Sequence, residues 1–178
     1  PVPAMAGKAD DTLNAAFALE PEALDTYKIA GREGLILARH IYDGLLYKHL
    51  DTGEIKPALA KAWRFVDPTT MEFDLREGVT FHNGKSLTAE DVVASINHHL
   101  DAKSTSAAKT VIGDVASVSA KGSDAVVFEL HSGNADFAYV VADYHLVIMP
   151  AKDGAADWQA GIGTSGYRLK SFEPGVRM

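Results

Sequence analysis

The stretch that decides the fold is residues 57–93, PALAKAWRFVDPTTMEFDLREGVTFHNGKSLTAEDVV. A short apolar run at 63–66 ends at Asp67-Pro68, where proline fixes φ and aspartate can hydrogen-bond its own backbone, so a turn is expected. Beyond this turn, three apolar and three charged side chains alternate: Met71, Phe73 and Leu75 against Glu72, Asp74 and Arg76. A period of two places the apolar side chains on one face, so the alternation predicts a half-buried strand.

A tight turn and a capped helix complete this block. Asn83-Gly84 is the residue pair that favours a type I′ hairpin turn. Thr88 stands where a helix N-cap belongs, and the acidic residues that follow it suit the positive end of the helix dipole. Apolar residues then recur at helical spacing: Val92, Val93, Ile96 and Leu100. The block therefore predicts strand, turn, strand, turn and helix.

The rest of the chain shows shorter patterns of the same kinds. Strands are expected at residues 12–18, 125–130, 146–149 and 167–172, and helices at 32–46 and 134–142. Residues 111–118 fit either a short helical turn or the start of a strand, and residues 151–162 form a connection rich in glycine and alanine. Strands interleaved with two or three helices predict a mixed α/β fold, with helices covering one face of a sheet.

Composition excludes several classes of function. The chain has 178 residues and a net charge of −7, whereas nucleic-acid binding requires a basic face, so no nucleic-acid partner is expected. It contains no run of 18 or more apolar residues, which predicts no stable membrane insertion. It contains no cysteine, so disulfides, thiolate nucleophiles and cysteine metal sites are excluded.

The central block also carries an ordered set of residues that matches a known family: Pro57, Leu59, Ala60, Trp63, Phe73, Leu75, Arg76, Gly78, Val79, Phe81, His82, Gly84, Leu87, Thr88, Ala89, Glu90, Asp91 and Val92. In this order they resemble the family 5 extracellular solute-binding proteins, the periplasmic peptide, dipeptide and nickel receptors of ABC importers. Three flanking segments fit the same family: Leu24-Asp25, residues 41–46 and residues 163–167.

The resemblance implies a fold and a division of the chain. The expected fold is a mixed α/β, periplasmic binding protein type II-like structure, present as the first-lobe portion with an inserted small α/β subdomain. Residues 12–42 and 163–178 would belong to lobe I, and residues 43–162 to the small subdomain. Residues 1–11 would be a flexible N-terminus, in which residues 4–6, Ala-Met-Ala, fit the cleavage pattern of a signal peptide. Family members are longer, and their opposite lobe has no counterpart in this sequence.

The residue patterns give little support to catalysis or metal binding. The seven histidines include no H-E-x-x-H pair, and neither a G-x-S-x-G elbow nor a phosphate-binding glycine loop occurs in its required context. No enzyme activity, catalytic residue, cofactor or metal site is therefore predicted. Two alternatives stay open. One is a nickel or haem-type cargo receptor of the same fold, because the family contains nickel receptors, and the other is a carboxylate-based hydrolase.

The predicted ligand-binding residues lie in two glycine-containing loops: Ala30, Gly31 and Arg32 in the first, Ser165 and Gly166 in the second. Such loops are expected at one end of a shared sheet, where α/β folds place ligands, and the resemblance implies the same two segments. Glycine lets a ligand backbone approach closely, Ser165 can donate or accept, and Arg32 offers a planar fork that suits a carboxylate. Ser165-Gly166 stands where the family has Gly-Pro.

The resemblance also implies a role. The expected function is that of a periplasmic receptor that delivers peptides or similar small solutes to the permease of an ABC importer. In other cell types the receptor would be secreted or lipid-anchored. It would act by binding and lobe closure, and its peptide would be held largely through backbone hydrogen bonds, which tolerate varied side chains.

Overall fold

The structure, a computed structural model, describes residues 26–28 and 31–173. Its largest element is an antiparallel sheet of four strands in the order β3-β4-β6-β5: Ala60–Asp67, Thr70–Leu75, Ala125–Leu130 and Val115–Lys121. Helix α2, Ala89–Leu100, packs on one face of this sheet, mainly against β5. The structure is therefore mixed α/β, as the sequence predicts.

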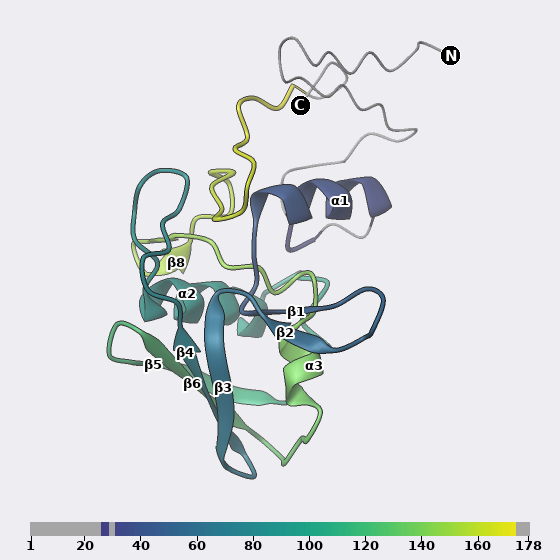
Figure 1. Ribbon diagram of the computed structural model, residues 1–178, viewed down its shortest axis with the longest axis vertical. Coiled ribbons are helices and arrows are strands. Elements are labelled where there is room, and N and C mark those ends of the chain that lie inside the picture. The colour runs from purple at the N-terminus through teal and green to yellow at the C-terminus, as the bar shows by residue number, and fades with distance from the viewer. Residues whose placement is uncertain (1–25, 29–30, 174–178) are drawn as a thin grey trace.

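The described chain also contains two further helices and two small hairpins. The hairpins pair β1 with β2 and β7 with β8, over Leu46–Lys48, Ile55–Pro57, Ala151–Lys152 and Ala155–Ala156 respectively. Helix α1, Arg32–Ile41, lies at the opposite end of the molecule from the sheet, with α2 between them (Figure 1). The short helix α3, Phe137–Val141, lies beside β1 (Figure 1).

The central block contains the predicted strand and the predicted helix. Met71, Phe73 and Leu75 of β4 are at most 2% exposed, so the buried face of the strand is the predicted one. Thr88 is the N-cap of α2, and the Asp91 carboxylate accepts hydrogen bonds from the N–H and the hydroxyl of Thr88, both at 2.9 Å. This arrangement gives a partner to a backbone donor at the start of the helix.

The turn at Asn83-Gly84 reverses the chain, but the predicted type I′ geometry is wrong. Thr80 and Ser86 form an antiparallel bridge across the turn. A type I′ turn needs positive φ at both central residues, whereas of these two only Gly84 has one, at 86°. The side-chain oxygen of Asn83 instead accepts a hydrogen bond from the Lys85 N–H, 3.0 Å away. Such local bonds to the backbone are the alternative that asparagine offers in turns.

Two apolar clusters hold the described chain together. The larger, the sheet core, lies between α2 and the sheet and contains an edge-to-face row of rings, with Phe73–Phe128 centroids at 5.2 Å and Phe128–Phe137 centroids at 5.6 Å. The smaller, the α1 core, packs against α1 and consists of Tyr27, Ala38, Ile41, Tyr42, Val147, Met149 and Ala156. Edge-to-face contacts add to the stabilisation that ring burial supplies.

Residues 146–149 connect the two cores. They are at most 5% exposed, as expected for a buried strand, but they form only an isolated bridge and no strand ladder. Leu146 and Ile148 belong to the sheet core, whereas Val147 and Met149 belong to the α1 core. Alternate side chains thus enter different cores, which explains why this short run is apolar throughout.

Helix α1 is shorter than the sequence predicts, because the residues after it pair with another segment. The predicted helix 32–46 ends at Ile41. Beyond it, Gly44 forms an antiparallel bridge with Val147. The Asp43 carbonyl accepts a hydrogen bond from the Ile148 N–H at 2.9 Å. Tertiary pairing therefore overrides a local helical pattern here.

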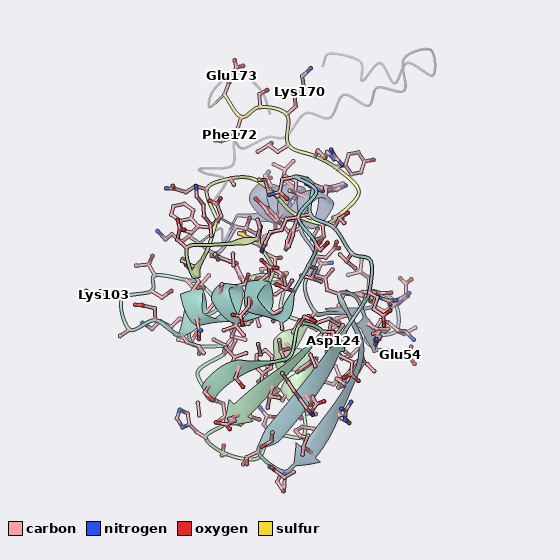
Figure 2. All side chains as sticks on the ribbon, turned by 90° about the vertical axis from the view of Figure 1, so that its left-hand side faces the viewer. Glu54, Lys103, Asp124, Lys170, Phe172 and Glu173 are labelled. Atoms are coloured by element: carbon pink, nitrogen blue, oxygen red, sulfur yellow. The ribbon has the colours of Figure 1, made fainter. Side chains whose placement is uncertain are left out.

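Other short predictions differ in extent or fall outside the structure. Of residues 134–142, only α3 is helical, and the connection 151–162 contains the β7–β8 hairpin. The predicted strand at 167–172 is wrong: this segment joins no sheet of the described chain and leads away from α2 beyond α1 (Figure 2). Its two alternating faces differ little in polarity, so nothing directs one face inward. The predicted strand 12–18 and the N-terminus 1–11 lie outside the described residues.

Strand β3 forms one edge of the four-stranded sheet. Phe65 and Val66 on this strand are 41% and 59% exposed, and the register with β4 shifts near both ends of β3.

On the outer face of the sheet, Glu72 of β4 is only 5% exposed, although its position in the alternation predicts a solvated charge. It is paired with Arg64 of β3 and with Lys121 of β5, the latter at 2.8 Å. A cation from the adjacent strand β3 and one from β5, two strands away, therefore pair with this carboxylate.

Candidate ligand-binding site

Residues 163–167, here called the site loop, pass the C-terminal end of α1, where the last helical carbonyls have no partner inside the helix. The Ser165 N–H donates to the Ile41 carbonyl and the Tyr167 N–H to the His40 carbonyl, each at 3.1 Å. The rings of Tyr167 and His40 meet edge to face, with centroids 5.3 Å apart. The part of the predicted site that contains Ser165 is thus fixed to the end of α1.

Gly163 lets the site loop approach the helix this closely. A Cβ atom at this position would lie 1.9 Å from the Ile41 carbonyl oxygen and 2.8 Å from the Tyr42 ring. No side chain fits in that space, so the contact requires glycine. The next residue adds a side-chain contact, because the Thr164 hydroxyl donates to the Asp43 carboxylate at 2.9 Å.

His82, from the turn that precedes α2, binds the site loop from the other side. Its backbone N–H donates to the Gly163 carbonyl at 2.9 Å. Its ring Nδ1 lies 3.3 Å from the Gly163 nitrogen, which donates to it, and its Nε2 lies 2.8 Å from the Ser165 carbonyl oxygen. His82 is therefore half-buried and joined to a segment some 80 residues further along the chain.

Thr164 and Gly166 are the residues of the site loop that keep both backbone groups free in the described structure. Gly163 and Ser165 use both of their backbone groups toward His82 and α1, and Tyr167 uses its N–H. Within the described part of the chain, no hydrogen bond engages the backbone N–H or carbonyl of Thr164 or Gly166. Gly166 is exposed, and a Cβ atom on it would meet no atom within 4 Å. This surface can therefore accept the backbone of a ligand.

The first predicted loop lies at the other end of α1. Gly31 is the N-cap of this helix and is exposed, while Ala30 falls outside the described residues. The Arg32 side chain is 81% exposed and makes a 3.3 Å ion pair with Glu33, whose side chain is only 8% exposed. The guanidinium group therefore extends into solvent from the start of α1.

The structure brings Ser165 and Gly166 together but does not bring them next to Gly31 and Arg32. Helix α1, which begins at Arg32 and ends at Ile41, separates the two pairs. At 1.5 Å per residue the helix spans about 14 Å between its first and last residues. Any ligand that touches both loops must therefore extend along α1.

Two hollows occur elsewhere on the described surface, between the C-terminal half of α1, β1 and the segment after α3. Their volumes are about 190 Å³ and 370 Å³. They share the lining residues Arg39, Ala142, Asp143 and Tyr144. None of the four described residues of the predicted site lines either hollow.

Buried titratable groups lie beside α2. His99 is fully buried, and its Nδ1 lies 2.6 Å from the Ser106 hydroxyl. Burial lowers the pKa of His99 to about 3, helped by the nearby His98 and His145. Burial alone raises the pKa of Asp143, but hydrogen bonds from the His145 ring and N–H, both at 2.9 Å, outweigh this and keep that pKa below its usual value. The described residues contain no cluster of three or more metal-binding side chains placed to hold an ion.

Sequence reasoning missed three residues that build the site. His82 and Gly163 both occur in the segments that carry the family resemblance, but no local pattern shows that they meet. Asp43 occurs in such a segment too, and its bond to Thr164 again joins distant parts of the chain. A signal for Gly163 was present, since glycine is the residue expected where two backbones approach closely.

Comparison with solved structures places this geometry in a known class. The periplasmic binding protein AgaA of A. tumefaciens R10, solved with agropinic acid, has a TM-score of 0.78 at 26% identity, over 88% of this chain and 32% of AgaA. The oligopeptide-binding protein AppA of Bacillus subtilis, solved with a nonapeptide, has a TM-score of 0.77 at 23% identity, over 88% of this chain and 33% of AppA. The fold is that of the type II periplasmic binding proteins.

Sequence comparison identifies the family. The family model described as "Bacterial extracellular solute-binding proteins, family 5 Middle" matches residues 54–178. Protein XP55 of Streptomyces lividans is 36% identical over 170 residues, which are 90% of this chain and 30% of that protein. The chain belongs to the family 5 bacterial extracellular solute-binding proteins. It spans about a third of the length of these relatives, and its described part contains no helix long and apolar enough to cross a membrane.

Proposed function

We propose that this chain is part of a receptor that binds peptides or similar small solutes and delivers them to the permease of an ABC importer. Family membership supports a binding role. The observation that carries the proposal is the site loop, in which alternate residues are fixed to the protein while Thr164 and Gly166 keep free backbone groups. Fixed loops with free backbone groups suit recognition of a peptide backbone, because the ligand then meets donors and acceptors that are already in place.

The length of α1 sets the size of the proposed ligand. The site loop and Arg32 lie at opposite ends of this helix, about 14 Å apart. An extended peptide advances about 3.3 Å per residue, so roughly four residues span that distance. In this arrangement Gly166 and Thr164 bind the peptide backbone, while Arg32 binds the terminal carboxylate through its planar fork. Gly31, together with Ala30, would allow the ligand to pass close to the start of α1.

The proposal extends to the whole protein. Residues 12–42 and 163–178 would form part of lobe I, residues 43–162 would form the small subdomain, and a second lobe would close over the ligand. Such a receptor works in the periplasm, or outside the membrane in other cell types, and performs no catalysis. The complexes of AgaA with agropinic acid and of AppA with a nonapeptide support a range of ligands from small solutes to peptides.

The test uses the complete receptor and a set of free-acid tetrapeptides, each with its C-terminally amidated counterpart. A tetrapeptide that binds the native state raises the melting temperature, because binding shifts the folding equilibrium. If Arg32 holds the terminal carboxylate in a closed cleft, Arg32→Gln should weaken the binding of the free-acid peptide by about 2–5 kcal/mol. This is the range for truncating one partner of a buried charge pair. The same variant should change the affinity for the amide much less.

Arg39→Gln is the matched control, because Arg39 is an exposed arginine at the other end of α1 and is not one of the proposed ligand-binding residues. It should leave the affinity for the tetrapeptide unchanged. If Arg32→Gln lost equal affinity for the free acid and for the amide, Arg32 would not be the residue that binds the terminal carboxylate. Absence of any thermal shift across the peptide set would contradict a peptide ligand of this length.

A further inference from the structure

The site loop is held mainly by a residue that does not belong to it. His82 lies in the turn before α2, yet it uses its backbone N–H and both ring nitrogens on residues of the site loop. It serves both polar backbone groups of Gly163 and the carbonyl of Ser165. No other described side chain makes more than one hydrogen bond to this loop.

These contacts define the protonation state of the ring. The Gly163 N–H is a donor, so Nδ1 must be the unprotonated acceptor. The Ser165 carbonyl is an acceptor, so Nε2 must carry the proton and donate. Only the neutral imidazole with its proton on Nε2 satisfies both contacts. In the other tautomer, the Nδ1–H group would face the Gly163 N–H, and the unprotonated Nε2 would face the Ser165 carbonyl, so neither hydrogen bond would form. In the imidazolium form both ring nitrogens are donors, so the bond to Gly163 would be lost.

We propose that His82, as the neutral Nε2–H tautomer, is the positioning residue that presents the Thr164 and Gly166 backbone to the ligand. This inference rests on the proposed function for the identity of the ligand, but the placement of the loop is a property of the unliganded protein. His82 acts through its neighbours: by engaging the carbonyls of Gly163 and Ser165 it fixes the peptide planes that precede Thr164 and Gly166. The residue itself does not touch the ligand.

The consequence of losing the ring nitrogens follows from the bonds they make. In His82→Phe the volume of the ring remains, but the Gly163 N–H and the Ser165 carbonyl lose their side-chain partners. The bond from the Ser165 N–H to the Ile41 carbonyl then carries more of the attachment of the loop to the protein. Local opening becomes easier, so the Ser165 amide should exchange its hydrogen at least about fivefold faster, a factor equivalent to about one hydrogen bond.

The experiment follows the complete receptor without ligand, so that its outcome does not depend on the proposed function. Nitrogen NMR of histidine-labelled protein near neutral pH should show pyridine-like Nδ1 and pyrrole-like Nε2 resonances for His82. Hydrogen exchange of the Ser165 amide should be faster in His82→Phe, and His82→Gln, which keeps an amide donor for the Ser165 carbonyl, should recover part of the protection. His131→Phe is the control, because His131 is exposed and its ring makes no hydrogen bond in the described structure.

A second experiment measures the affinity of each variant for the free-acid tetrapeptide that raises the melting temperature of the receptor most. His82→Phe should weaken this tetrapeptide at least about fivefold while the denaturant midpoint of unfolding changes little, and His131→Phe should alter neither. A protonated Nδ1, or unchanged Ser165 exchange in His82→Phe, would overturn the positioning role. If the wild-type protein binds no tetrapeptide while the ring and exchange results hold, the proposed peptide ligand fails and the role of His82 in placing the loop stands.

Discussion

His99 remains neutral in the folded protein over most of the acidic range, because burial lowers its pKa to about 3. In the unfolded chain the pKa of a histidine is about 6.5. Between these two values the unfolded state binds a proton that the folded state excludes. The free energy of unfolding therefore falls as the pH drops through this window, by up to about 1.4 kcal/mol per pH unit. Above the window His99 is neutral in both states and has no such effect.

We therefore expect His99→Gln to reduce the dependence of stability on pH. Between about pH 6 and pH 4 the slope of the unfolding free energy should be smaller by about 1 kcal/mol per pH unit than in the wild type. Urea titrations at several pH values measure this slope. His131→Gln, which removes an exposed histidine, should leave the slope nearly unchanged. Parallel slopes for His99→Gln and the wild type would show that His99 titrates normally in the folded protein.

Sequence patterns predict the face of a residue better than its partners. The alternation in β4 correctly places Phe73 in the sheet core, because a strand has only two faces. The same alternation assigns Glu72 to the solvent, and Glu72 is nevertheless buried. Its burial depends on Lys121, which lies 49 positions away and is brought alongside by the β5–β6 pairing. Contacts of this kind arise only once the sheet has formed.

At the scale of elements, the start of α2 depends on a single carboxylate. The Asp91 side chain is fully buried, accepts two hydrogen bonds from Thr88 and one from the Ala151 N–H at 2.6 Å, and pairs with Lys85. It therefore both caps the helix and attaches the β7–β8 hairpin to it. Glu90, one residue earlier, is exposed and makes no such contacts.

We expect Asp91→Ala to destabilise the protein by about 2–4 kcal/mol, because it removes a cap and leaves the half-buried N–H groups of Thr88 and Ala151 without partners. Glu90→Ala is the matched control, since it removes only an exposed charge near the helix dipole, and should cost less than about 1 kcal/mol. Denaturant titration of both variants gives the two values. Similar losses for the two positions would mean that charge in the first turn, rather than the hydrogen-bond network, stabilises α2.

Elements with strong local patterns were predictable, and those that depend on distant pairing were not. Strand β4, strand β6 and α2 each follow from periodicity and from caps or turn residues next to them. The helix predicted for residues 32–46 ended early because Gly44 pairs with a segment about 100 positions away. For the same reason the stretch 146–149 kept its predicted burial but gained only one bridge in place of a ladder.

At the scale of the whole molecule, the sheet core is local to one part of the chain. Its buried members all lie between Leu45 and Ile148. We predict that residues 43–162, expressed alone, fold as a unit around this core. Amide hydrogen exchange should show protection in β4, β6 and α2, although Val147 and Met149 lose the α1 core that covers them. Protection no greater than that of a disordered peptide would show that the α1 core is required for folding.

The candidate site was predictable only in part, because the described residues of its two loops lie at opposite ends of α1. The sequence pointed to Ser165 and Gly166 together, and both lie in the site loop. It also placed Gly31 and Arg32 beside them at one end of a shared sheet, whereas α1 separates the two pairs. The length of that helix, and hence the span of the site, was set by the pairing of Gly44 and could not be read from local patterns.

The exposed edge of β3 bears on how this protein behaves at high concentration. A long edge strand with Phe65 and Val66 at its surface is a template for strands of other molecules, the first step toward aggregation. Here the two register shifts bend the edge, and Lys61 and Arg64 place positive charges along it. Because Lys61 is paired with Glu77 and Arg64 with Asp74, a second copy would have to desolvate these ion pairs and pair over an irregular ladder. The same irregularity that interrupts pairing with β4 therefore favours solubility.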